Sequence, residues 1–517
     1  MRGWMVLLAV WAMGCSSFAE LKLATVFADG MVLQRDQKVA VWGWADPGAE
    51  VTVSFAGQER NATAGADGKF MVRLKKMEAS AKPQVLVVKA GADVVEVGNV
   101  VVGEVWLCSG QSNMAMSVKG ADQFEKEQAA ANFPLIRMFT TARTTSTEPL
   151  ADCSGSWQVC APETVGGYSA TAYFFGREIH KELGVPVGLL HSSWGGTCVE
   201  AWTPIASMEQ FPSVMEYKAG LDAQAGRFDP AAEQAKQARA LEQWVEKVKQ
   251  AKAEGKKAPR RPQPKTDPKQ SQNYPANLYN AMIHPLVPYG MRGAIWYQGE
   301  RNAKTSEGAM LYRDLLENMV VQWRKDWNSE FPFYAVQLVN YKKPQELPVE
   351  DTAWAFIRES FLNFHKEVPN VGIAVTIDVG MEKNIHPTDK QAVGYRLARQ
   401  ALAKTYKMEV VAGGPIYESM KKEGGKIVIT FDDVGSGLVE QGAAPLKTFA
   451  IAGADKQFVA AQAAIVGQTV VVGSPEVSDP VAVRYAWADN PVGCNLFNKE
   501  GFPASPFRTD DWPSTGE

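Results

Sequence analysis

The sequence predicts an α/β protein that carries β-sandwich-like regions at both ends. Apolar strands alternate with amphipathic helices between residues 101 and 405, which is typical of a parallel sheet covered by helices on both faces. Residues 20–100 and 406–517 contain short β-rich runs separated by turn residues. A chain of 517 residues is also too long for one ordinary domain.

Residues 1–19 have the composition of a secretion signal. Arg2 supplies the positive end, Trp4 to Met13 is apolar, and small residues surround a cleavage position near Ala19. In an alternative interpretation, Cys15 is the lipidated residue of a lipoprotein processing site. The apolar stretch is too short to span a membrane. We therefore expect a secreted or periplasmic protein, with lipid anchoring through Cys15 as the second choice.

The remaining composition excludes some classes of function. A net charge of −3 gives no electrostatic case for nucleic-acid binding. Five cysteines follow the signal, and no spacing among them suggests a metal site, so we expect no metal and no cofactor. Cys153 and Cys160 could pair in an oxidising compartment, or all five cysteines could be buried hydrophobes. The oligomeric state is left open.

The β-rich runs of the two terminal regions can be placed individually. In residues 20–100 they are Val39–Ala45, Val51–Ala56, Lys69–Leu74 and Gln84–Ala90, which together predict a small sandwich. In residues 406–517 the clearest runs are Lys426–Asp432 and Val481–Ala488, and they predict a second β-rich domain.

The central region, residues 101–405, is expected to form the α/β domain. Its predicted buried strands are Val105–Ser109, Val187–His191, Ala294–Gln298, Phe333–Val339 and Val371–Asp378. Its predicted helices are Ser169–Leu183, with Ser169 as N-cap, Ala309–Trp327 and Thr388–Lys404. Residues 215–273 interrupt this alternation. They contain a charged helical stretch and a basic, proline-rich segment, and are expected to be an exposed insertion.

A candidate nucleophile follows the first central strand. The segment Ser109-Gly-Gln-Ser112 predicts a tight turn that presents Ser112 at the start of a helix, beyond the carboxyl end of the strand. Ligands of such folds bind at this edge of the sheet. Helix N-terminal amides there stabilise negative charge that develops on a substrate.

A serine nucleophile needs a base, and the chain has only five histidines. His386 lies in a loop that leads into the last central helix, and Pro387 restrains the backbone beside it. A loop at the end of an α/β core is a suitable position for a catalytic base. His386 is therefore our choice.

An oxyanion requires two or three convergent hydrogen-bond donors. The backbone N–H of Ser112 is one candidate, and the Gly195-Gly196 turn permits close backbone approach and supplies another. Gln298 or Asn302 could donate a side-chain N–H. The nearby carboxylates Glu200 and Glu300 are expected to orient their neighbours rather than to act directly.

Four segments, taken together, resemble the sialate O-acetylesterase family of the SGNH/GDSL hydrolase superfamily. They are Gly110-Gln-Ser112-Asn-Met, Gly195-Gly-Thr-Cys-Val-Glu200, Trp296-Tyr-Gln-Gly-Glu300 and Ile385-His386-Pro. Similar stretches elsewhere extend the resemblance over most of residues 20–517. It implies a flavodoxin-like three-layer core and removal of acetyl groups from sugar hydroxyls. It also implies that Ser112 attacks the acetyl carbonyl while His386 accepts its proton.

The chain departs from the superfamily pattern beside the histidine. Superfamily members usually carry an Asp two or three residues before it, where this chain has Asn384 and Lys383. His386 could instead be oriented by a backbone carbonyl, by the Asn384 amide oxygen or by Asp378. We favour a Ser-His dyad with a neutral acceptor.

The substrate expected from the resemblance is an O-acetylated sugar or glycan. Sialate is the first choice, and acetylated xylan or another plant or algal glycan is the alternative. Gln111, Glu200, Glu300 and Arg301 are expected to line the substrate site, and Arg301 or Arg358 could bind a sialate carboxylate. An interpretation of another class is a carbohydrate-binding protein whose esterase site has decayed.

Overall fold

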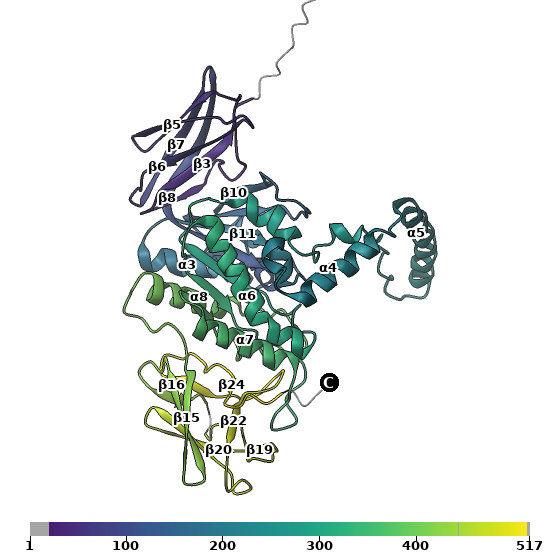
Figure 1. Ribbon diagram of the computed structural model, residues 1–517, viewed down its shortest axis with the longest axis vertical. Coiled ribbons are helices and arrows are strands. Elements are labelled where there is room, and N and C mark those ends of the chain that lie inside the picture. Colours follow the sequence, from purple (N-terminus) through teal and green to yellow (C-terminus); the bar gives the residue numbers. More distant parts are fainter. Residues whose placement is uncertain (1–19, 443, 514–517) are drawn as a thin grey trace, which may run out of the picture.

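A computed structural model describes residues 20–442 and 444–513, so the predicted secretion signal and Cys15 lie outside the described residues. A β region at the N-terminal end, a central α/β body and a second β region follow one another along the long axis of the molecule (Figure 1). The predicted α/β core with flanking β-sandwich-like regions is confirmed.

The N-terminal region consists of two small sheets. One sheet has the order β1-β3-β6, and β4, β5 and β7 pair in the other. Side chains of β6 alternate between exposed and buried, so one face of the strand packs into the core. The bounds are β1 Lys22–Leu23, β2 Val32–Gln34, β3 Val39–Trp44, β4 Glu50–Phe55, β5 Gln58–Thr63, β6 Lys69–Leu74 and β7 Ser80–Ala90.

Strand β8, Asp93–Gly110, joins this region to the central sheet as one continuous strand of 18 residues. Its first part pairs antiparallel with β7 and parallel with β2. Its last part pairs in parallel with β11 and β12, and residues 100–110 are all buried. The boundary expected at residue 100 therefore falls within a strand.

The central sheet has the order β10-β9-β11-β8-β12-β13-β14. Every neighbouring pair in it is parallel except β9 and β10, which are antiparallel. The remaining bounds are β9 Phe133–Thr141, β10 Gly155–Cys160, β11 Val187–Ser193, β12 Gly293–Tyr297, β13 Phe333–Val336 and β14 Val371–Ala374.

Helices cover both faces of this sheet (Figure 1), with α3 packed on α8 and α6 packed on α7. Trp106 of β8 packs on Phe175 of α3, whereas Trp296 of β12 packs on Trp323 of α6. Ser169 caps α3 as predicted, since its side chain accepts a hydrogen bond from the Ala172 N–H. The bounds are α3 Ala170–Leu183, α6 Ser306–Trp327, α7 Ala353–Glu367 and α8 Lys390–Gln400.

Shorter helical segments fill the connections. They are α1 Ser112–Ala115, α2 Phe124–Ala129, the 3₁₀ turns η1 Val118–Gly120, η2 Val165–Gly167, η3 Val199–Trp202, η4 Ile205–Met208, η5 Pro268–Gln270 and η7 His284–Leu286, and the π-helical turns η6 Tyr279–Ile283 and η8 Ala401–Thr405. The helix predicted to end at Lys404 thus finishes as a π-helical turn.

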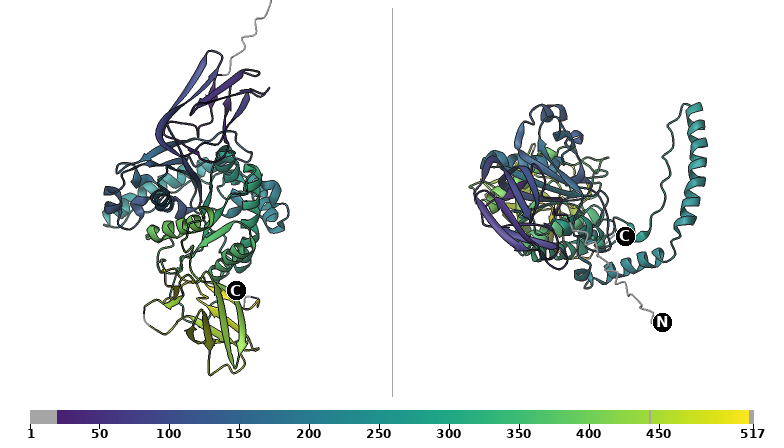
Figure 2. Two further views of the ribbon diagram at one scale, coloured as in Figure 1. Left: turned by 90° about the vertical axis from the view of Figure 1, so that its left-hand side faces the viewer. Right: turned by 90° about the horizontal axis from the view of Figure 1, so that it is seen from above.

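The predicted insertion forms a two-helix arm, α4 Pro212–Ala225 and α5 Pro230–Ala253. Helix α5 has no buried residue, and it stands away from the body of the molecule (Figure 2). Asp229 caps it by accepting hydrogen bonds from two backbone N–H groups. Neither α5 nor any other helix within the described ranges combines the length and apolar character needed to cross a membrane.

The C-terminal region contains one sheet of order β15-β16-β21-β20 and another of order β19-β18-β22-β24, with β17 paired to β23. The bounds are β15 Ile416–Glu423, β16 Lys426–Asp432, β17 Leu438–Glu440, β18 Phe449–Ala452, β19 Phe458–Ala460, β20 Gln462–Val466, β21 Thr469–Gly473, β22 Ala482–Tyr485, β23 Leu496–Asn498 and β24 Phe507–Arg508.

Arg358 of α7 attaches this region to the central body. It is fully buried, and its guanidinium donates to the carbonyls of Leu338, Val339, Ala488 and Asp489. Arg358 is therefore not available to bind a sialate carboxylate, because its guanidinium is buried and bonded to backbone carbonyls.

The five cysteines among the described residues are free thiols. Cys153 and Cys160 are buried and unpaired, and burial raises their thiol pKa values to about 12 and about 11. Both therefore behave as small apolar side chains at neutral pH.

Removal of the arm should leave the rest of the fold intact. The ends of the segment 233–265 lie together, because the Lys265 N–H donates to the Glu233 side chain. We expect that replacing this segment with a short Gly-Ser linker changes the midpoint of thermal unfolding by less than about 2 °C, since it exposes little apolar surface. A large fall, measured by circular dichroism, would contradict the exposed placement of α5.

Candidate active site

Ser112 is the first residue of α1, directly after the turn that follows the carboxyl end of β8. Gly110 has a φ of 137°, and a Cβ at that position would lie 2.2 Å from the carbonyl oxygen of Tyr297. Only glycine fits both constraints. The Gln111 N–H donates to the same carbonyl at 2.9 Å and closes the turn. The local sequence thus fixes the direction in which Ser112 projects.

His386 reaches Ser112 from the loop between β14 and α8. Its Nε2 atom lies 2.7 Å from the Ser112 Oγ atom, across 274 residues of sequence. The loop is held in place by Asn113, whose Nδ2 donates to the Ile385 carbonyl at 3.0 Å. Burial lowers the pKa of His386, and Lys390 acts in the same direction against the opposing effect of Glu300. A neutral imidazole is therefore favoured near pH 7.

The predicted glycine turn also packs against Ser112. A Cβ on Gly195 would lie 3.1 Å from the Ser112 Cβ atom, so the close approach depends on glycine. The carbonyls of Gly195 and Gly196 accept hydrogen bonds from Gln272 and Asn273, which brace the turn. Within the described ranges, the backbone N–H groups of Ser112 and Gly195 donate to no protein acceptor. Both remain available to a ligand.

Gln298 differs from the expectation of an oxyanion donor. It is buried, and its Nε2 donates to the Thr197 carbonyl at 2.9 Å and to the Asn302 Oδ1 atom at 2.8 Å. Asn302 Nδ2 in turn donates to Glu200 at 3.0 Å. These hydrogen bonds hold the loop after β11 against the loop after β12. Because the amide donors are engaged there, they are not directed at an oxyanion. Glu200 orients Asn302, in line with the orienting role expected of it.

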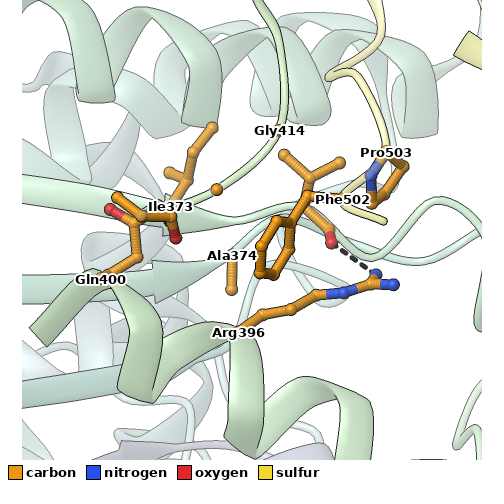
Figure 3. A pocket seen from close by; sticks show the side chains of 10 residues that line it. Ile373, Ala374, Arg396, Gln400, Gly414, Phe502 and Pro503 are labelled. Atoms are coloured by element: carbon orange, nitrogen blue, oxygen red, sulfur yellow. Dashed lines mark hydrogen bonds between the residues drawn. The ribbon is translucent and has the colours of Figure 1, made fainter. Parts of the chain in front are cut away.

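Neither of the two candidate orienters contacts the His386 ring. Asn384 Oδ1 accepts from the backbone N–H of His386 at 3.0 Å. Asp378 forms a two-point ion pair with Arg396, at 2.6 and 2.7 Å. Arg396 also donates to the Val375 carbonyl beside a cavity of about 10 Å³, and it extends along the edge of that cavity (Figure 3). Asp378 is thus committed to a strong partner, which corrects that expectation.

A cavity of about 440 Å³ opens over the Ser112–His386 pair. It is lined by Ser112, Ala115, Met116, Arg143, Gly195, Asn384 and His386. The residues expected to line the substrate site are not among these. Gln111 donates to Glu300, Glu200 accepts from Asn302, and Arg301 is exposed but does not line the cavity.

Three residues that form or support the candidate site were not predicted from the sequence. Arg143 follows β9, a strand that pairs in parallel with β11, so its end lies at the same sheet edge as the nucleophile. Assigning residues 133–141 as a central strand would have revealed it. Asn113 and Lys390 flank the predicted catalytic residues in sequence, but only their contacts distinguish them from ordinary polar residues.

Comparisons with known proteins show what this chain is similar to. A family model described as "Carbohydrate esterase, sialic acid-specific acetylesterase" matches residues 266–403. Sialate O-acetylesterase of Mus musculus is 28% identical over 549 aligned positions, which cover 97% of this chain and 96% of the mouse protein. The enzyme of Rattus norvegicus is 29% identical over 439 positions, covering 78% of this chain and 77% of the rat protein.

A solved structure is similar over nearly the whole chain. The carbohydrate acetylesterase from Xanthomonas citri is 36% identical and superimposes with a TM-score of 0.80, covering 95% of this chain and 100% of that chain. Sequence and fold therefore agree over the terminal β regions as well as the central sheet. The chain belongs to the sialate O-acetylesterase family of carbohydrate esterases.

Proposed function

We propose that this protein is a secreted carbohydrate O-acetylesterase that hydrolyses acetyl esters on sugar hydroxyls through a Ser112 acetyl-enzyme. The observation that carries the proposal is the 2.7 Å contact between Ser112 Oγ and His386 Nε2 at the floor of an open cavity. Secretion is supported by the composition of residues 1–19.

In the first half-reaction, Ser112 Oγ attacks the acetyl carbonyl carbon while His386 Nε2 accepts its proton. The N–H groups of Ser112 and Gly195 donate to the oxyanion of the tetrahedral intermediate. The intermediate collapses with cleavage of the carbon–oxygen bond to the sugar. The imidazolium then returns the proton to the departing sugar oxygen, which leaves as a neutral hydroxyl.

In the second half-reaction, water attacks the acetyl-enzyme and His386 accepts a proton from it. The same two backbone donors hold the second oxyanion. Its collapse releases acetate and returns the proton to Ser112 Oγ, so His386 is neutral again at the end of the cycle. A neutral histidine at the start of each half-reaction is consistent with the lowered pKa of His386.

Arg143 favours an anionic sugar such as sialate over a neutral glycan. It lines the cavity, and its Nε donates to the Ser193 carbonyl at 3.3 Å. In the part of the chain that the structure describes, its two Nη groups have no hydrogen-bond or ion-pair partner. A guanidinium held at one nitrogen and free at the others suits a two-point contact with a substrate carboxylate.

The Ser112→Ala variant tests the enzyme function. We expect hydrolysis of p-nitrophenyl acetate to fall by at least about 10³-fold, because no other group can form the acetyl-enzyme. Mass spectrometry of rapidly quenched wild type should detect an acetyl group on Ser112. Equal background rates for wild type and Ser112→Ala would instead support a carbohydrate-binding protein with a decayed site.

The pH dependence of kcat/KM should reflect the lowered pKa of His386. Only the neutral imidazole accepts the Ser112 proton, so activity is lost as pH falls through the histidine pKa in the free enzyme. We expect the midpoint of the acid limb to lie below 6.5, the ordinary pKa of histidine. A midpoint above 6.5 in a p-nitrophenyl acetate profile would contradict this environment.

The Arg143→Gln variant tests the substrate class. Loss of a charge-assisted contact should raise KM for O-acetylated sialic acid by about 10-fold or more, and leave p-nitrophenyl acetate hydrolysis within about 2-fold. Arg301→Gln is the matched control, since Arg301 is also exposed but does not line the cavity. An equal effect of Arg143→Gln on acetylated xylan would favour a neutral glycan.

A further inference from the structure

A buried lysine contacts Asn113, the residue next to Ser112 in the proposed catalytic pair. Lys390, the first residue of α8, is fully buried, and lysine is almost never so unless paired. Its Nζ atom donates to Asn113 Oδ1 at 2.7 Å and lies 5.1 Å from the centroid of the Tyr297 ring. None of these groups carries a negative charge, so the compensating charge must lie further along.

That charge is supplied by Glu300, on the far side of the same amide. Asn113 Nδ2 donates to Glu300 Oε1 at 2.6 Å as well as to the Ile385 carbonyl. Glu300 Oε2 accepts a further hydrogen bond from Gln111. One asparagine thus bridges the Lys390 ammonium and the Glu300 carboxylate, which form no direct ion pair with each other within the described residues. The bridge connects the loops that follow β8, β12 and β14.

The bridge holds the two residues of the proposed dyad at fixed positions. Asn113 is the neighbour of Ser112 in sequence, and Ile385 is the neighbour of His386. A rotation of the Asn113 amide would break the contacts with Lys390, Glu300 and Ile385 together. The orientation of the amide is therefore set by the charges at its two ends, with Nδ2 toward the carboxylate and Oδ1 toward the ammonium.

Both charges also act on His386. Glu300 favours its protonated form, whereas Lys390 disfavours it. Asp389 lies beside Lys390 and caps α8 through the Ala392 N–H. Burial keeps the Tyr297 hydroxyl neutral by raising its pKa, and Arg143 lines the same cavity as Ser112 and His386. Burial lowers the pKa of Lys390 to about 7, so the lysine is charged over the acidic range in which His386 titrates.

We propose that Lys390 is a positioning residue that, through Asn113 and Glu300, fixes the His386 loop against Ser112 and balances the charge of Glu300 so that His386 remains an effective base. The proposal rests on the roles proposed above for Ser112 and His386. Lys390 is buried and does not line the cavity. Its effect is exerted through the asparagine amide and through the electrostatic potential at the imidazole.

The Lys390→Met variant tests the charge balance. Removing the ammonium leaves Glu300 unopposed, which stabilises the imidazolium and raises the pKa of His386. We expect the acid limb of kcat/KM for p-nitrophenyl acetate to move upward by at least about 0.5 pH unit. The double variant Lys390→Met/Glu300→Gln should return the midpoint toward the wild-type value. Lys404→Met, in the turn that continues α8, is the matched control and should leave the midpoint unchanged.

A second variant separates the effect of the charge from that of the hydrogen bond. It also keeps the proposal testable if Lys390→Met fails to fold. Lys390→Gln keeps a donor for Asn113 Oδ1 but removes the charge, so it should reproduce the upward shift with less loss of kcat. A uniform fall in rate with an unchanged midpoint in both variants would overturn the proposal, because a merely structural residue acts in that way. Ser112→Ala provides the independent check: if it retains wild-type rates, the proposed function fails instead.

Discussion

The buried carboxylate of Glu104 stabilises the strand on which the active site depends. It accepts hydrogen bonds from Arg35 in the N-terminal region at 2.5 Å, and from Arg292 just before β12 at 2.8 and 3.1 Å. These pairs outweigh the cost of burial and hold the pKa of Glu104 below its ordinary value, so the carboxylate stays charged. Strand β8 is thereby fixed between two regions six residues before its end. Slippage of this strand would move Ser112 away from Gly195 and His386 together.

Within the described residues, the His386 ring contacts Ser112 but has no hydrogen bond to a carboxylate. In many serine hydrolases a carboxylate fixes the imidazole tautomer and stabilises the imidazolium. Here Glu300 is hydrogen-bonded to Gln111 and Asn113 and does not touch the ring. It favours the protonated imidazole only through its charge. Orientation of His386 instead comes from its backbone, through Asn384 and the Ile385 carbonyl. Orientation and charge compensation, which one Asp commonly provides together, are divided between different residues in this protein.

Sequence reasoning predicted the parts of the site that depend on backbone geometry. Ser112, Gly195 and His386 lie together as expected, because turns and glycines leave local signatures and strand order brings their loops to one sheet edge. The side-chain partners were predicted poorly. Gln298 and Asp378 have suitable chemical groups, but those groups bind Asn302 and Arg396. Such choices depend on contacts between residues distant in sequence, which neither periodicity nor spacing encodes. The same limit explains why Lys390, buried at a helix start, resembled an ordinary surface lysine.

The Arg358 contacts make the packing of the central body depend on the last part of the chain. Helix α7 buries a guanidinium whose acceptors include the carbonyls of Ala488 and Asp489, about 130 residues later in the chain. Without those two carbonyls the buried charge would lose part of the hydrogen bonding that replaces its solvation, which is costly. The C-terminal region therefore completes the core of the central body, and it is not a module that could be detached without a loss of stability.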